Sequence, residues 1–264
     1  MKGDNMTEVN DPSLWWKQAV VYQVYPRSFK DSRGEGLGQI AGVTEKIGYL
    51  KELGVDAIWL SPFYPSQLAD GGYDVDDYRN VDPKLGTMDD FDALAKAAHA
   101  DGIKIVVDIV PNHSSNLHEW FKAALAAKPG SPERDRYIFR DGKGPNGDEP
   151  PTNWQNHFGG PAWTRVPDGQ WYLHMFTKEQ PDWNWKNEDV RADSIKTLRF
   201  WLDHGADGFR VDVAHGLAKD LDRDDLDDYV VWCTNDQPED GSHPVIDRDE
   251  VHDIYHEWRK VLDR

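Results

Sequence analysis

The chain of 264 residues carries 48 acidic and 30 basic side chains, a net charge of −18, and one cysteine, Cys233. This charge argues against nucleic acid or an anionic membrane surface as a partner and is compatible with a neutral ligand. A single cysteine cannot form an internal disulfide, and no apolar run is long enough to span a membrane. Residues 1–12 lack the apolar centre of a signal peptide, so we expect a disordered leader and a cytoplasmic protein.

The first part of the chain alternates strand patterns with helix patterns. Short apolar stretches at 19–25 and 55–60 predict strands, each followed by proline or serine-proline. Helical periodicity covers 40–53 and 89–100, and a glycine follows each of these segments closely, as at many helix ends.

A third strand is predicted at 103–110, a near-continuous apolar run that only Asp108 interrupts. An apolar run of this length is typical of a buried parallel strand. Pro111, Asn112 and His113 follow at once. Polar groups gathered at the carboxyl end of such a strand indicate a site.

The segment 114–178 is too long for an ordinary loop and is rich in Gly, Pro, Asn and Trp. We expect an inserted small domain here, with turns at 129–132 and 142–151. Its predicted strands are 137–139 and 171–176.

After a predicted helix at 190–204, the segment 208–215 (GFRVDVAH) is the most informative of the chain. Arg210 and Asp212 are two residues apart on a strand, so they share a face and the guanidinium keeps the carboxylate ionised. This arrangement suits a nucleophilic aspartate, although an ordinary ion pair at a strand end is the alternative. An amphipathic helix is predicted at 250–262.

Strands that alternate with helices and end in polar residues predict an α/β fold, a (β/α)8 TIM-type barrel of which about the first four β/α units are present. The expected division is a leader at 1–12, the first part of the barrel at 13–113, the inserted domain at 114–178 and the continuation of the barrel at 179–264, truncated before the fifth strand.

Three segments in order carry a family resemblance: 108–113 (DIVPNH), 180–185 (QPDWNW) and 208–215. Two more extend it, 69–74 (ADGGYD) and 158–163 (FGGPAW). Together they resemble the α-amylase superfamily of retaining glycoside hydrolases, and within it the α-glucosidase and oligo-1,6-glucosidase branch. The similarity runs from about Trp15 to the last residue.

The resemblance implies a role for each matching residue. Asp212 corresponds to the nucleophile that attacks the anomeric carbon, and Arg210 orients it. His113 corresponds to a ligand of the glucose hydroxyls beside the cleaved bond, Asp70 to the carboxylate that binds the terminal O4 and O6, and Tyr73 to a stacking platform. Such a grip on the chain end favours exo action. The alternatives are a structural histidine for His113 and a turn aspartate for Asp70.

Other positions carry weaker implications. Phe158 and Gln180 are expected to line the pocket, with simple packing as the alternative. Val213, directly after the nucleophile, resembles enzymes that accept α-1,6 bonds. Asp108 and Asn112 are expected to position His113.

Two expected features of the family have no counterpart here. The glutamate that acts as general acid, at the end of the next strand, and a later His-Asp pair that binds O2 and O3 do not occur. We therefore expect this chain to be the N-terminal portion of a longer enzyme whose C-terminal half is missing, and to be inactive alone.

We expect no metal and no cofactor. Members of this branch often bind a divalent ion in the loop that matches 31–39 (DSRGEGLGQ), but Arg33 places a cation there and Gln39 removes a charge. The acidic run 220–228 (DLDRDDLDD) is expected to be a solvated loop or helix face.

Three functions are compatible with this pattern. The first is an exo-acting retaining α-glucosidase that hydrolyses terminal α-linked glucose from short oligosaccharides through a glycosyl-aspartate intermediate. The second is a sucrose or trehalose isomerase or an α-glucosyl transferase on the same scaffold. The third is a non-catalytic carbohydrate-binding or transport-associated subunit, which would have no need of Asp212, Arg210 and His113 together.

Overall fold

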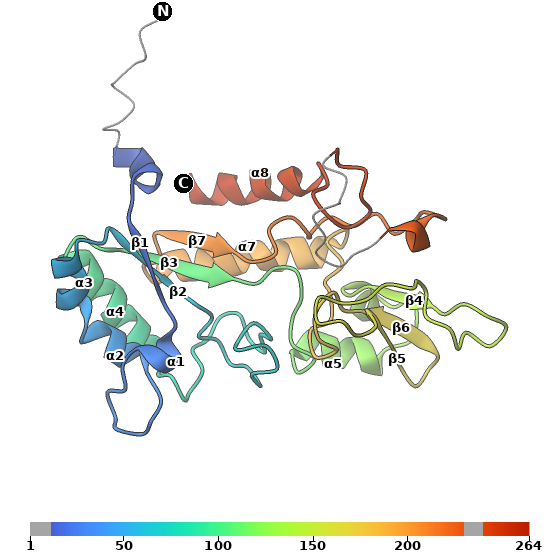
Figure 1. Cartoon of the computed structure of the whole chain (residues 1–264), viewed down its shortest axis with the longest axis horizontal. Helices are drawn as coiled ribbons and strands as arrows, with labels where there is room; N and C mark the ends of the chain where they lie inside the picture. Colours follow the sequence, from blue (N-terminus) through green and yellow to red (C-terminus); the bar gives the residue numbers. More distant parts are fainter. Residues whose placement is uncertain (1–11, 230–239, 264) are drawn as a thin grey trace, which may run out of the picture.

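The structure, a computed structural model, describes residues 12–229 and 240–263. The greater part of the expected leader, 1–11, and Cys233 lie outside the described residues. A parallel sheet with helices around it forms the main body, and a second sheet lies in a separate lobe beside it (Figure 1). Within the described ranges, no helix is long and apolar enough to cross a bilayer.

The main sheet has the order β1-β2-β3-β7, and all its neighbours are parallel. Its strands are β1 (Val21–Val24), β2 (Ala57–Leu60), β3 (Lys104–Ile109) and β7 (Gly208–Val211). Because the strands are parallel, their carboxyl ends meet at one edge, where the polar residues that follow each strand are brought together. The four β/α units expected from the sequence are confirmed.

The helices of the main body agree with the predicted segments at 89–100, 190–204 and 250–262 but differ at 40–53, and the short helices at 12–17 and 26–29 were not predicted. The helices of this body are α1 (Pro26–Phe29), α2 (Ile40–Thr44), α3 (Ile47–Leu53), α4 (Met88–Ala100), α7 (Glu188–Asp203) and α8 (Val251–Leu262), and the short 3-10 helix η2 (Pro12–Lys17) precedes β1. The prediction of a single helix at 40–53 is wrong, because the backbone leaves helical geometry at Lys46, with φ −104° and ψ 4°.

The longer helices begin at side-chain caps. Thr87 and Asp90 form a reciprocal capping box at the start of α4, and Asn187 accepts hydrogen bonds from two backbone amides at the start of α7. These caps satisfy amides that a helix leaves unpaired in its first turn.

Aromatic rings fix the helices to the sheet. The ring of Trp201 on α7 lies 4.8 Å from Phe91 on α4 and 5.2 Å from Phe63, which follows β2. All three side chains are fully buried. Each such pair adds about 0.5–1.5 kcal/mol beyond the burial of its area, so this cluster holds α4 and α7 in place behind the strands.

The inserted segment forms an antiparallel sheet of order β4-β6-β5. Its elements are α5 (Glu119–Ala126), α6 (Pro132–Asp135), β4 (Phe139–Asp141), β5 (Trp163–Arg165) and β6 (Gln170–Leu173). The strands expected at 137–139 and 171–176 correspond to β4 and β6 with shifted bounds, whereas β5 was missed because three residues are too few to show alternation.

The acidic run 220–228 folds against this lobe. Leu221 and Leu226 are buried in the lobe's own apolar cluster, and Trp154 Nε1 donates to the carbonyl of Leu226. The carboxylates face outward; Asp222, for example, pairs with Arg140 at 3.0 Å. A loop with the short 3-10 helix η3 (Leu226–Asp228) therefore joins the lobe to the segment after β7.

Candidate active site

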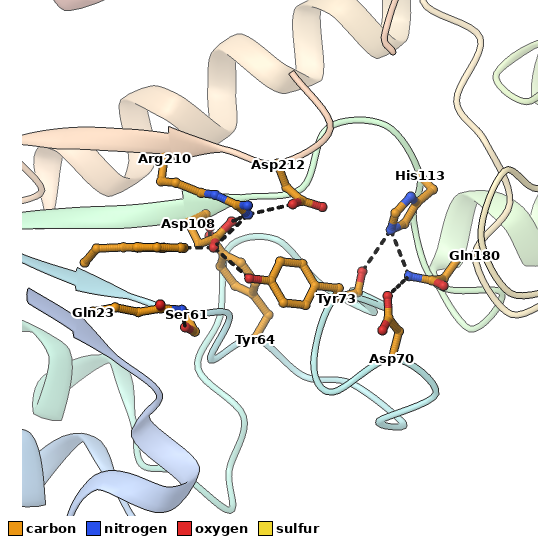
Figure 2. A network of polar contacts seen from close by, with 11 residues as sticks. Gln23, Ser61, Tyr64, Asp70, Tyr73, Asp108, His113, Gln180, Arg210 and Asp212 are labelled. Atoms are coloured by element: carbon orange, nitrogen blue, oxygen red, sulfur yellow. Dashed lines mark hydrogen bonds and ion pairs between the residues drawn. The ribbon is translucent and has the colours of Figure 1, made fainter. Parts of the chain in front are cut away.

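The carboxyl edge of the main sheet gathers the polar residues that the sequence singled out (Figure 2). Asp108 comes from the end of β3, Arg210 from β7, and Asp212 from the residue that follows β7. Asp108 and Arg210 are register partners on neighbouring strands, so their side chains share a face of the sheet.

The expected ion pair between Arg210 and Asp212 is present. Arg210 Nη1 lies 2.6 Å from Asp212 Oδ1 and 3.2 Å from each carboxylate oxygen of Asp108. The Asp108 side chain is fully buried, whereas that of Asp212 is 16 % exposed. The guanidinium of Arg210 therefore hydrogen-bonds to both carboxylates, and its shorter bond is to the more exposed one, Asp212.

The environment of Asp108 differs from the one expected. Its carboxylate accepts hydrogen bonds from Trp59 Nε1 at 3.0 Å, Tyr73 Oη at 3.2 Å and Arg210. Asp108 therefore positions Arg210 and Tyr73 rather than contacting His113 directly. Its register partner on β7 is Arg210, so the two side chains share a face of the sheet. Burial raises the pKa of Asp108 to about 7, and the negative charge of Asp212 adds to this effect against the lowering effect of Arg210.

A second polar group lies across the ring of Tyr73 (Figure 2). His113 Nε2 is 3.1 Å from the carbonyl oxygen of Tyr73 and 3.0 Å from Gln180 Nε2, and Gln180 Nε2 donates to Asp70 Oδ2 at 3.0 Å. Burial lowers the pKa of His113, so the ring is neutral near pH 7. The fold thus brings together Asp70, Tyr73, His113 and Gln180 from three separate segments.

The carboxylate of Asp70 is not the group that closes its own turn. Asp74 performs that task, because its carboxylate accepts from Ser66 Oγ at 2.8 Å, Gln67 N at 3.1 Å and Asp70 N at 3.2 Å. The Asp70 side chain instead faces Gln180, which argues against the turn alternative.

Phe158 and Val213 lie near these groups in different ways. The Phe158 side chain is 59 % exposed, and its ring is 6.4 Å from that of Phe176, which in turn lies 4.9 Å from His113. Val213 has φ 49°, a left-handed backbone that a β-branched residue adopts only under constraint. The hydrogen bond from Gly216 N to Val213 O, at 3.0 Å, holds the turn that follows Asp212.

Lys219 was not predicted as part of the site. Its ammonium lies 2.8 Å from Asn112 Oδ1, 2.7 Å from the carbonyl of Gly216 and 3.2 Å from Asp182 Oδ2. Asn112 Nδ2 in turn lies 3.1 Å from His113 Nδ1, so the expected positioning role of Asn112 agrees with the geometry. A lone lysine seven residues after the nucleophile candidate carries no sequence signal of burial.

The loop 31–39 does not fit a divalent ion. Asp31 uses both oxygens to accept backbone amides, from Arg33 at 2.9 Å, Gly34 at 2.7 Å and Gly36 at 2.7 Å. These bonds, chiefly that from Gly36, lower the pKa of Asp31 to about 2. Among the residues described, no group of three or more His, Cys, Asp or Glu side chains could hold a metal ion. The absence of a bound metal remains a prediction.

The model of the α-amylase catalytic domain matches residues 23–264, and the chain belongs to this family. The catalytic domain of the family is a (β/α)8 barrel, of which the four parallel strands form part.

The chain is 50 % identical over 214 residues to an oligo-1,6-glucosidase of Heyndrickxia coagulans, covering 81 % of this chain and 38 % of the relative. It is 44 % identical over 248 residues to a trehalose-6-phosphate hydrolase of Escherichia coli (strain K12), covering 93 % and 42 %. A solved trehalose-6-phosphate hydrolase from Bacillus licheniformis superposes with a TM-score of 0.83 at 44 % identity, over 94 % of this chain and 43 % of that one. The chain therefore spans about two fifths of the length of these relatives.

Proposed function

We propose that this chain supplies the nucleophile side of the active site of an exo-acting retaining α-glucosidase, which releases terminal α-linked glucose from short oligosaccharides. One observation carries the proposal. The Arg210–Asp212 pair and the group formed by Asp70, His113 and Gln180 lie at the same edge of the barrel, on either side of the Tyr73 ring (Figure 2).

In the proposed mechanism, Asp212 attacks the anomeric carbon. Arg210 holds Oδ1 at 2.6 Å, and we assign the attack to Oδ2. A bond forms between this oxygen and the anomeric carbon while the glycosidic carbon–oxygen bond breaks, and its electron pair stays on the leaving oxygen. A carboxylic acid about 5 to 5.5 Å from the nucleophile must protonate that oxygen. In this proposal the acid lies in the remainder of the enzyme.

The second polar group fixes the sugar. Asp70 supplies an acceptor and Gln180 a donor, 3.0 Å apart, and this pairing suits the O4 and O6 hydroxyls of a terminal glucose. A carboxylate that binds the chain end leaves no room for a further sugar unit, which supports exo action. Val213 beside the nucleophile supports acceptance of α-1,6 bonds. The single cysteine supports a cytoplasmic location.

A sucrose isomerase or transferase is the second candidate. A trehalulose synthase superposes on this chain with a TM-score of 0.81 at 42 % identity. Such enzymes would share the nucleophile and differ in the acceptor that resolves the intermediate. A non-catalytic binding subunit is disfavoured by the Arg210–Asp212 pair, which binding alone does not require.

The test is to extend the chain with the C-terminal portion of the H. coagulans relative and to assay a chromogenic α-glucoside. We expect hydrolysis by the extended protein and none by the 264-residue chain, because general acid help contributes about two to four powers of ten. Product analysis on isomaltose and sucrose then separates hydrolase from isomerase. A folded extended protein with no activity on any α-glucoside would contradict the proposal.

A further inference from the structure

Lys219 is a buried cation that contacts the segments of Asn112 and Asp182 and the turn that follows Asp212. Its side chain is 4 % exposed. It donates hydrogen bonds to Asn112 Oδ1 and to the carbonyl of Gly216, and it forms an ion pair at 3.2 Å with the fully buried carboxylate of Asp182. An ammonium has three N–H donors and no acceptor, so each atom that hydrogen-bonds to Lys219 must be an acceptor. Because Lys219 is the donor in these hydrogen bonds, it determines the orientation of the side-chain amide of Asn112.

The side-chain amide of Asn112 can face Lys219 only with its oxygen, because Lys219 can only donate. Its nitrogen then faces His113 Nδ1 at 3.1 Å. The amide nitrogen donates, so Nδ1 must accept and carries no proton. A neutral imidazole with an unprotonated Nδ1 has its proton on Nε2.

The two neutral tautomers of His113 differ in how many of the ring's polar contacts are favourable. With the proton on Nε2, the ring donates to the carbonyl of Tyr73 at 3.1 Å and accepts from Asn112, and only the amide of Gln180 faces a like group. With the proton on Nδ1, both Asn112 and the carbonyl of Tyr73 face a like group. The Nε2–H tautomer thus has two favourable contacts, with Asn112 and Tyr73, whereas the other tautomer has one, with Gln180. This difference favours the Nε2–H tautomer.

The hydrogen bonds of Gln180 determine which atom of its amide faces His113. Its Oε1 accepts from Thr177 N and Thr177 Oγ1, each at 3.1 Å, so the atom near His113 is the amide nitrogen. That nitrogen donates to Asp70. In the Nε2–H tautomer, the 3.0 Å approach of Gln180 to His113 is thus a contact between two donors, which a bound oxygen acceptor would relieve.

We propose that Lys219 is a positioning residue that acts through Asn112 to hold His113 in the Nε2–H tautomer. An acceptor oxygen of a ligand that took over the Nε2–H of His113 from the carbonyl of Tyr73 would also lie within reach of the amide donor of Gln180. That the ligand is a sugar hydroxyl rests on the proposed function; the tautomer itself does not.

The test is ¹⁵N NMR of the protein labelled at histidine, without sugar. A His113→Gln variant assigns the signals of this ring among the 10 histidines of the chain. The nitrogen shifts distinguish a protonated from an unprotonated Nδ1. The proposal expects the Nε2–H pattern in the wild type and predicts that Asn112→Asp places a proton on Nδ1, because both carboxylate oxygens accept.

Lys219→Met removes the donor that fixes Asn112, with Lys219→Arg as the matched variant that keeps a donor-only side chain. The proposal expects a mixture of tautomers in Lys219→Met and the wild-type pattern in Lys219→Arg. A wild type with a protonated Nδ1, or a folded Asn112→Asp variant that keeps the Nε2–H pattern, would overturn it. If Lys219→Met does not fold, the wild type and Asn112→Asp still decide. A failure of the glucosidase assay would not alter these spectra, so the two proposals fail separately.

Discussion

Asp108 and Asp212 share one donor atom, Arg210 Nη1, which lies 3.2 Å from both oxygens of Asp108 and 2.6 Å from Asp212 Oδ1. The fully buried Asp108 accepts from the guanidinium and fixes its direction, and Asp212 accepts the short bond at the open side. The two carboxylates have different environments, which is a common way to separate the roles of paired acids.

Replacement of Arg210 should impair turnover more than folding. We expect Arg210→Met in the extended protein to lower kcat by about two to three powers of ten, because Asp212 loses the donor that orients it. Arg210→Lys is the matched variant, and it should recover only part of the loss, since one ammonium cannot reproduce the bonds to both carboxylates. Equal kcat in wild type and Arg210→Met would exclude an orienting role.

The raised pKa of Asp108 predicts a pH-dependent stability. The folded protein binds this proton up to about pH 7, and the unfolded chain releases it near 3.8. The contribution is therefore fully present below the unfolded pKa and is lost as the pH rises to about 7. Relative to Asp108→Asn, the wild type should lose free energy of unfolding, on the order of a few kcal/mol, between about pH 4 and 7. A difference in free energy of unfolding between the wild type and Asp108→Asn that stays constant over this pH range would contradict the prediction.

Removal of the Asp70 carboxylate should alter the preference for chain ends. Asp70→Ala is expected to lower kcat on maltose, because the hydrogen bonds that hold the terminal glucose are lost. Activity on longer maltooligosaccharides should rise relative to activity on maltose. Asp70→Asn keeps the size of the side chain and is the control for packing. If Asp70→Ala only lowers the thermal transition, with unchanged kinetics, Asp70 is a structural residue.

Val213 is the position where linkage preference should respond. We expect Val213→Ala to shift the ratio of kcat/KM for isomaltose and maltose toward maltose by roughly tenfold, since one or two methyl groups contribute about 1–3 kcal/mol in such pockets. Because the backbone is left-handed at this residue, with φ 49°, Val213→Gly should relax it and serves to separate backbone from side-chain effects. An unchanged ratio in Val213→Ala would remove this residue from the determinants of specificity.

The parts of the site that the sequence could predict are those in which local geometry decides. Arg210 and Asp212 are two residues apart on a strand, so their pairing follows from the strand period. The contact between Gln180 and Asp70 joins residues 110 apart and depends on how the inserted lobe lies over the barrel edge. Its geometry could not be derived from either segment alone.

The parts that were missed have physical reasons as well. Lys219 reads as a surface residue, because lysines are rarely buried unless paired. Its partners Asn112 and Asp182 come from other segments. The break at Lys46 was hidden because Val43 and Ile47 remain buried on both sides of it, so the apolar pattern continues through the kink.

The most direct measurement of the central claim is covalent trapping on Asp212. An α-glucosyl fluoride with a second fluorine on the ring needs little acid help to lose its fluoride, and the added fluorine slows hydrolysis of the intermediate. After incubation with the extended protein and peptide mass spectrometry, we expect one fluorinated glucosyl group bound to Asp212 and none in the Asp212→Asn variant. Labelling of a different carboxylate, or turnover above about a tenth of wild type in a folded Asp212→Asn variant, would contradict the assignment.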